Sequence, residues 1–107
     1  MYLASLSWKK AEKAITADRP VIVPLGSVEN HGTQLPLGTD FMVPEALARM
    51  IEEPTDVLVL PVMPYGVCSH HMDFPGTLNI GHEAFLAVMR NLVGSLSCLS
   101  GELSKFG

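Results

Sequence analysis

The fold is decided by the stretch VIVPLGSVENHGTQLPLGTD, residues 21–40. It opens on Val21-Ile22-Val23, a β-branched run without polar alternation, which is typical of a strand buried on both faces of a sheet. The rest of the stretch is rich in Gly, Pro, Ser, Thr and Asn, and this composition indicates a long loop. Long loops in small domains usually carry function. The stretch therefore predicts a buried strand that leads into a functional loop.

The segments around this stretch alternate between helical and strand patterns. The predicted helices lie at about residues 7–16, 43–52 and 82–107. A second continuous apolar run, residues 57–60, predicts another buried strand, and a second long loop follows it over residues 61–76. A short extended piece over residues 77–80 precedes the last helix. This order indicates an α/β fold, namely a three-layer α/β/α arrangement with a mainly parallel sheet.

Local signals refine these elements. Ser7 can cap the first helix, and Trp8 is expected to pack that helix. Pro44 suits the first turn of the second helix, which places Asp40 or Thr39 just before that helix. The last helix is expected to run out near Gly107, because glycine is common after a helix end. Both long loops follow a strand, so they should meet where ligand sites form, at the carboxyl ends of the strands.

The overall composition indicates a folded protein. The chain has 107 residues, 48% of them hydrophobic and 17% charged, which suits one small domain and argues against disorder. The net charge is −4 without a Lys/Arg cluster, so nucleic acid and anionic membranes are disfavoured as partners. The first residues do not read as a signal peptide. Cys68 and Cys98 are isolated and suit reduced thiols. We expect a soluble, cytoplasmic protein.

Three side chains of the first loop could bind a cation: Glu29, His31 and Asp40. Glu29 and His31 are two residues apart, so an extended backbone places both side chains on the same side. Asp40 follows a turn containing Gly and Pro that could bring it back. Carboxylates and imidazole suit Zn²⁺ or Mn²⁺. Such residues are also common as solvated members of a polar loop, so their spacing alone leaves both interpretations open.

The whole string around these residues resembles a known family signature. Residues 23–40, VPLGSVENHGTQLPLGTD, are similar to the creatininase (creatinine amidohydrolase) pattern Pro-x-Gly-Ser-x-Glu-x-His-Gly-x-His-Leu-Pro-x-x-Thr-Asp. Gln34 stands where a second His is common, a position that we interpret as outside the direct ligands. Residues 64–77, PYGVCSHHMDFPGT, resemble the family segment Tyr-Gly-x-Ser-x-x-His-x-x-Phe-Pro-Gly-Thr, with Cys68 at the Ser position. The resemblance covers nearly the whole chain.

The resemblance implies a metal-dependent hydrolase of a non-peptide C–N bond, in an amide or a cyclic amide, that acts through metal-activated water. It implies Glu29, His31 and Asp40 as ligands of a divalent metal, Zn or Mn. In the complete enzyme the site would be binuclear, with Asp40 bridging two ions. The implied substrate is a small-molecule amide.

The second loop supplies the candidate pocket residues. His71 matches the family His and is expected to line the site or a subunit contact. Tyr65 and Phe74 are expected to wall the loop, with packing as the alternative to substrate contact. No catalytic residue is assigned. Cys68 has no base placed beside it by the sequence, so a nucleophilic role has no support, and His70 is expected to be exposed.

A third family motif, Asn-Gly-His-x-x-Asn, does not occur in these residues. We therefore expect residues 1–107 to be the N-terminal part of a single creatininase-like domain. A parallel sheet that is cut short exposes an apolar edge, so we expect a homo-oligomer or pairing with a complementing C-terminal fragment. The alternative to an enzyme is a catalytically inactive, structural fragment that needs a second chain or further sequence.

Overall fold

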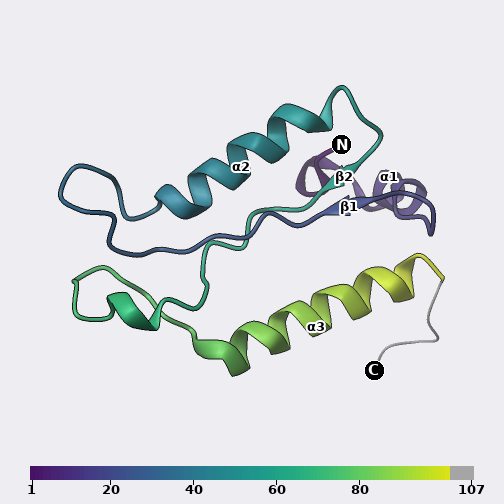
Figure 1. Cartoon of the computed structure of the whole chain (residues 1–107). Coiled ribbons are helices and arrows are strands. Elements are labelled where there is room, and N and C mark those ends of the chain that lie inside the picture. The colour runs from purple at the N-terminus through teal and green to yellow at the C-terminus, as the bar shows by residue number, and fades with distance from the viewer. Residues whose placement is uncertain (102–107) are drawn as a thin grey trace.

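The structure is a computed structural model, and it describes residues 1–101. Within these residues, three α-helices and two short strands are joined by long loops, in the arrangement shown in Figure 1. The elements are α1 (Trp8–Ala14), β1 (Val21–Ile22), α2 (Thr39–Glu52), β2 (Leu58–Val59) and α3 (Gly81–Leu99), with short 3-10 turns at Leu3–Ser5 and Ser69–His71. Within the described residues, none of the helices combines the length and the apolar character that crossing a membrane requires.

The two strands are parallel, as the sequence predicts. Val21 lies opposite Leu58, and Ile22 lies opposite Val59. Tyr2 forms a bridge with Val59 on the other side of β2. Within the described part of the chain, β2 is therefore the central strand and β1 is an edge.

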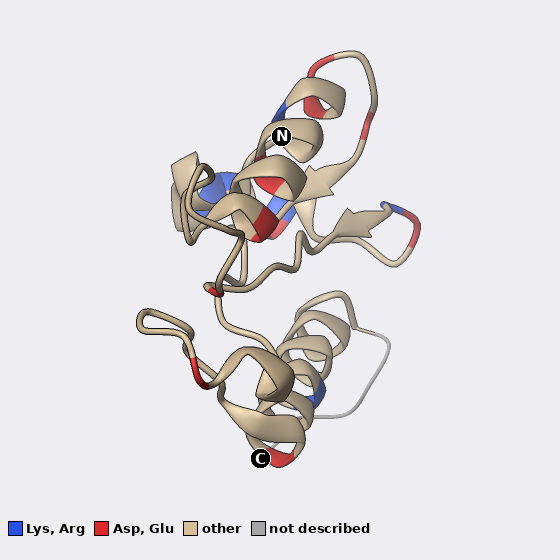
Figure 2. Cartoon of the chain, turned by 60° about the vertical axis from the view of Figure 1, so that its left-hand side comes forward, with Lys and Arg blue, Asp and Glu red and all other residues tan. Residues whose placement is uncertain are grey.

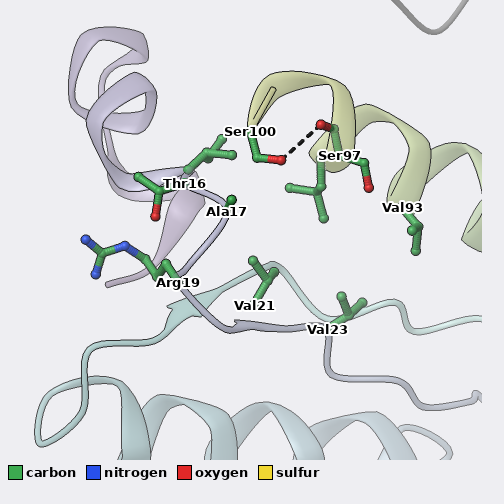
Figure 3. Close-up of a pocket in the computed structure, with 10 residues that line it drawn as sticks. Thr16, Ala17, Arg19, Val21, Val23, Val93, Ser97 and Ser100 are labelled. Carbon is green, nitrogen blue, oxygen red and sulfur yellow. Dashed lines mark hydrogen bonds between the residues drawn. The ribbon is translucent and has the colours of Figure 1, made fainter. Parts of the chain in front are cut away.

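The two strands differ in burial. Leu58 and Val59 are fully buried, which confirms the prediction for β2. The residues of β1 are only half-buried, so the prediction of burial on both faces is wrong for this strand. The reason is visible beside it: a cavity of about 250 Å³ separates β1 from α3, with Val21, Val23 and Val93 among its walls (Figure 3).

The helices lie on both sides of the strand pair. In the views of Figures 1 and 2, α2 lies on one side of the strands and α3 on the other. Helices on both sides of a parallel pair are the three-layer α/β/α arrangement that the alternating pattern predicts. The described sheet is narrow, with only β1 and β2 as named strands.

The second helix begins earlier than predicted. It starts at Thr39, where the Thr39 amide and hydroxyl both donate to the carbonyl of Pro36. Asp40 therefore lies in the first turn of α2 instead of before the helix. Pro44 lies inside the helix, where its nitrogen cannot donate to the carbonyl of Asp40. The helix therefore begins where Thr39 bonds to the Pro36 carbonyl, and not at Pro44, which the sequence pattern placed in the first turn.

The first and last helices also depart from expectation. Ser7 caps α1 as predicted, accepting a bond from the Lys10 amide at 3.3 Å. Trp8 is 72% exposed beneath the Lys9 ammonium, so the prediction that it packs the helix is wrong. The last helix ends at Leu99, and Gly101 adopts φ +85°, a turn that favours glycine over other residues. The predicted continuation of this helix over residues 102–107 lies outside the described residues.

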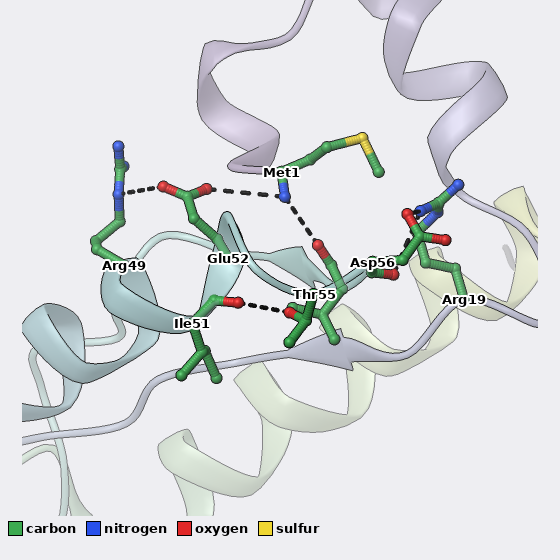
Figure 4. A network of polar contacts seen from close by, with 8 residues as sticks. Met1, Arg19, Arg49, Ile51, Glu52, Thr55 and Asp56 are labelled. Atoms are coloured by element: carbon green, nitrogen blue, oxygen red, sulfur yellow. Dashed lines mark hydrogen bonds and ion pairs between the residues drawn. The ribbon is translucent and has the colours of Figure 1, made fainter.

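A polar network ties the N-terminus to the segment that enters β2 (Figure 4). The Met1 ammonium donates to the carbonyl of Val57 at 2.9 Å and lies 3.8 Å from the Glu52 carboxylate. Arg49 pairs with the same carboxylate at 2.8 Å. These contacts fix the start of β2 against the end of α2, far along the strands from the first loop.

Candidate metal centre

The first loop and the first turn of α2 bring the three predicted ligands together. Glu29, His31 and Asp40 each offer one ligand atom, and these atoms lie within 4.8 Å of one another. His31 Nε2 is 3.1 Å from Asp40 Oδ1. Ligand atoms around one tetrahedral ion with bonds of about 2.1 Å stand roughly 3.4 Å apart. The cluster therefore has the dimensions of a cation site.

Close backbone packing places Asp40 beside the loop. A Cβ on Gly26 would clash with the backbone of Phe41 and would lie 2.5 Å from the carbonyl oxygen of Asp40. Glycine at this position therefore lets the chain after β1 touch the first turn of α2. The Glu29 amide donates to the carbonyl of Leu37 at 3.0 Å and closes the loop between the two carboxylates. The N-terminus of a helix also favours a negative charge such as that of Asp40.

The segment that follows the second long loop packs against the first loop, where Val28 and Leu78 form an antiparallel bridge. The Leu78 amide donates to the carbonyl of Val28 at 2.9 Å. The Asn30 amide donates to the hydroxyl of Thr77, also a buried residue, at 3.0 Å. These bonds hold the backbone on both sides of Glu29. Within the predicted extended piece, Leu78 and Asn79 form bridges with Val28 and Gly66, whereas Ile80 already has helical backbone angles at the start of α3.

Sequence reasoning missed Ser27. This serine is only 8% exposed, and its hydroxyl lies 3.1 Å from Glu29 Oε1 and 3.2 Å from Asp40 Oδ2. Its place between the glycine that touches α2 and the first ligand is the sequence signal that could have pointed to it. The hydroxyl links carboxylates from two different elements.

The electrostatics of the cluster favour an ionised Asp40. Side-chain hydrogen bonding with Glu29 is the largest cause that lowers the pKa of the Asp40 carboxyl. Burial opposes this shift, while the charge of His31 and hydrogen bonds from Ser27 and His31 lower the pKa further. An ionised carboxylate is the form that binds a cation.

The His31 ring has a buried nitrogen that lacks a bonding partner in the part of the chain that the structure describes. Its Nδ1 atom is buried and has no hydrogen-bond partner among the described residues. A buried ring nitrogen without a partner is costly, and a histidine that binds a metal uses one nitrogen for the ion and the other for a fixed acceptor. Two carboxylates and one imidazole are also a donor set that Zn²⁺ and Mn²⁺ accept. The residues present therefore fit a divalent metal.

Cys68 lies close to this cluster but is not activated. It is 1% exposed, and its thiol donates to the carbonyl of Leu78 at 3.0 Å. Burial raises the pKa of the Cys68 thiol, and the negative charge of Glu29 raises it further. A raised pKa keeps the thiol protonated near neutral pH, which agrees with the absence of a nucleophilic role.

The predicted pocket residues are not joined to the cluster by any contact that the described structure records. The His71 ring lies 6.3 Å from the Phe74 ring, centroid to centroid. Tyr65 and Phe74 are 44% and 49% exposed. His70 is exposed, as expected. The role of His71, Tyr65 and Phe74 as pocket walls stays a prediction.

The comparison with known families follows the same residues. The family model described as "Creatininase: Creatinine amidohydrolase" matches residues 4–99, which include all three ligand candidates and both loops. The chain belongs to the creatininase family. This membership confirms the resemblance on which the ligand assignment was based.

Individual relatives agree with the family. The mycofactocin precursor peptide peptidase of Mycobacterium tuberculosis is 32% identical over 93 residues, covering 78% of this chain and 37% of the relative. The creatinine amidohydrolase of Pseudomonas putida is 25% identical over 103 residues, covering 91% of this chain and 40% of that enzyme. The chain thus spans about two fifths of the length of these creatininase relatives.

Solved structures confirm the fold. A crystal structure of creatinine amidohydrolase (creatininase) superimposes with a TM-score of 0.86 at 25% identity, covering 92% of this chain and 40% of that chain. Similar creatininase structures are described as a Mn form, with a TM-score of 0.85, and as a variant of the Zn-Zn type, with a TM-score of 0.84. The long loops of this chain are therefore part of the creatininase architecture.

Proposed function

We propose that this chain carries the first part of the site of a metal-dependent hydrolase that cleaves a C–N bond in an amide or a cyclic amide. The observation that carries the proposal is the convergence of Glu29, His31 and Asp40 from a strand-end loop and a helix start. Relatives whose names specify a creatinine amidohydrolase, a peptide peptidase and an inosose hydrolase support hydrolysis as the common chemistry.

A divalent ion in such a site supplies activation of water and polarisation of a carbonyl group. The chain's own residues would bind and orient that ion. Glu29 and Asp40 would contribute negative charge, and His31 would contribute a neutral nitrogen ligand. The Mn and Zn-Zn forms of the creatininase structures support either metal, and a paired site, as candidates for this chain. Asp40 would be one of the residues that hold the metal, whether the site takes one ion or two.

Metal binding by the purified chain tests this proposal. Calorimetric titration with Zn²⁺ and with Mn²⁺ is compared for the wild type, Glu29→Gln and His31→Ala. We expect each variant to lose affinity by more than about 100-fold, because even partners outside the direct ligands change metal affinity by 10- to 100-fold. His82→Ala and Glu83→Gln are matched controls, since these residues are exposed in the first turn of α3. Equal binding by all five proteins would overturn the proposal and would favour a structural role for the chain.

Among the described strands, β1 has a free edge that a further strand could occupy. Helices α2 and α3 lie on opposite sides of the strands (Figure 1), and strand–helix–strand crossovers are right-handed in nearly all parallel sheets. A crossover through α2 leads from β1 to β2, so a crossover of the same hand through α3 leads back past β1. The next strand would then occupy the free edge of β1.

We propose that a further part of a creatininase-type domain supplies this strand, and that self-association takes its place when that part is missing. An added strand would line the cavity between β1 and α3 and cover Val21, Val23 and Val93. It would also make the end of β1 the point where the strand order reverses. Parallel sheets bind ligands at such points, which is where the Glu29 loop lies.

A further inference from the structure

Ser27 lies where the two elements that carry the candidate ligands meet. It follows Gly26, which touches the first turn of α2 so closely that a Cβ would lie 2.5 Å from the Asp40 carbonyl oxygen. The Ser27 side chain is therefore held at the junction and is only 8% exposed. From this place its hydroxyl reaches one carboxylate of the loop and one of the helix.

The hydroxyl makes contacts of nearly equal length with both carboxylates. It lies 3.1 Å from Glu29 Oε1 and 3.2 Å from Asp40 Oδ2. A hydroxyl has one hydrogen to donate, and both distances exceed the usual 2.5–3.0 Å of an O–H···O bond. The hydroxyl hydrogen is therefore shared between the two carboxylates in a three-centre arrangement of two long contacts.

The two carboxylate oxygens of Asp40 contact different side chains. Oδ2 faces Ser27, while Oδ1 faces His31 Nε2 at 3.1 Å. Holding Oδ2 fixes the rotation of the carboxylate and presents Oδ1 on the side of the imidazole. The same hydroxyl restrains Glu29 Oε1, so it sets the separation of the two negative groups.

We propose that Ser27 is a positioning residue that orients the Glu29 and Asp40 carboxylates toward one cation and thereby raises the affinity of the site. It acts through these ligands and touches neither ion nor substrate. The inference rests on the proposed function, because it needs Glu29 and Asp40 to be metal ligands.

The test compares Ser27→Thr with Ser27→Val. These side chains have the same shape and differ in one hydroxyl, so any steric effect of the added bulk is common to both. The Zn²⁺ dissociation constant is measured by competition with a chromophoric chelator, and the metal-free proteins are compared by urea unfolding. We expect the Val variant to bind Zn²⁺ about 10-fold more weakly than the Thr variant, the scale found for groups that orient metal ligands.

A spectroscopic readout separates orientation from stability. The visible absorption of bound Co²⁺ reports ligand geometry, and we expect it to change in Ser27→Val and to stay close to that of the wild type in Ser27→Thr. Thr77→Val is the matched control, because Thr77 is equally buried and its hydroxyl bonds the Asn30 amide without touching either carboxylate. Because that bond holds the loop beside Glu29, this variant should weaken Zn²⁺ binding, but clearly less than Ser27→Val does, and it should leave the Co²⁺ spectrum close to that of the wild type.

The outcomes distinguish the two proposals. Wild-type binding with equal affinities and spectra for the Thr and Val variants would overturn the role of Ser27 and leave the metal site standing. A loss in Thr77→Val as large as that in Ser27→Val would also overturn it, because the effect would then be general loosening of the loop. A wild-type chain that binds neither Zn²⁺ nor Co²⁺ would overturn both.

Discussion

The two loops that meet beyond the strands, which we call the loop end of the sheet (residues 24–40 and 61–80), and helix α3 differ in which side chains they bury. At the loop end, small and polar residues are buried and bonded across the two loops, with Ser27 and Thr77 each only 8% exposed. Helix α3 has 19 residues, yet Gly94 is its one buried residue. Several of its large apolar side chains are more than half exposed, including Leu86 at 57% and Leu99 at 68%. The candidate site is therefore organised by buried, bonded side chains, while large apolar side chains of α3 are left exposed among the described residues.

The largest effect is expected where the loop end touches α2. Gly26→Ala places a Cβ against the backbone of Phe41 and 2.5 Å from the Asp40 carbonyl oxygen, and backbone atoms cannot move aside as a side-chain tip can. We expect a loss of about 3 kcal/mol or more in unfolding free energy, at the upper end of overpacking effects. Urea unfolding followed by circular dichroism measures it.

Gly81→Ala is the matched control for this clash. Gly81 has a positive φ of +78°, but a Cβ there meets nothing within 4 Å. Its cost should be limited to backbone strain of about 1–2 kcal/mol. If Gly26→Ala were no more destabilising than Gly81→Ala, the close approach of the loop and α2 would be wrong.

The next largest effect contrasts the core with α3. Leu58→Ala should cost about 2–5 kcal/mol, because Leu58 is 0% exposed and its removal leaves a cavity. Leu86→Ala should cost less than about 0.5 kcal/mol, because Leu86 is 57% exposed. Both are measured by urea unfolding at low protein concentration. A large, concentration-dependent cost of Leu86→Ala would mean that α3 is already covered in solution by another copy of the chain.

These contrasts show which parts of the structure the sequence could predict. The apolar runs around Ile22 and Leu58 predicted the parallel pair, because apolar runs without polar alternation are typical of strands in a parallel sheet. The convergence of Glu29, His31 and Asp40 was expected from a motif and required only that the loop fold back, while their role as metal ligands stays a prediction. The start of α2 was missed, because Thr39 bonding to Pro36 is a contact that no periodicity reveals. Ser27 was missed because its role depends on a carboxylate from a different element.

Burial was harder to predict than element type. Trp8 was expected to pack because large aromatic residues usually do, yet it is exposed in α1 beneath Lys9. The residues of β1 were expected to be buried on both faces, yet a cavity lies beside them. Hydrophobic patterns record the surface that a complete fold would cover. They do not say whether the covering element is present among the described residues.

The assembly prediction gives an effect on molecular mass. The chain has a mass of 11.6 kDa, and we expect light scattering to give a larger value for the wild type, because within residues 1–101 one edge of β1 is unpaired and large apolar side chains of α3 are exposed. Val23→Pro removes an amide that points away from β2, since the carbonyl of Ile22 already pairs with Leu60 on the other side. This variant should shift the mass toward the monomer.

Leu86→Lys offers a second route to the same result on α3, where exposure makes the charge tolerable in the monomer. A drop in mass with Val23→Pro alone would place self-association at the strand edge, and a drop with Leu86→Lys alone would place it on α3. A monodisperse 11.6 kDa wild type at high concentration would contradict self-association altogether.

The smallest effect compares the two cysteines, one in each region. Cys68 is 1% exposed at the loop end, whereas Cys98 on α3 is half-buried. Because burial and the Glu29 charge raise the pKa of the Cys68 thiol, less of it is ionised at pH 8, and the thiolate is the reactive form. We expect Cys68 to react with a thiol reagent at least about 10-fold more slowly than Cys98. Cys68→Ser and Cys98→Ser proteins assign the two rates, and unfolding in urea should make them equal.

Glu29→Gln should speed the reaction of Cys68 slightly, because it removes the smaller of the two causes that raise the pKa of the Cys68 thiol. Equal native rates would show that the loop end opens as readily as the uncovered helix, and the contrast between the two regions would then be lost.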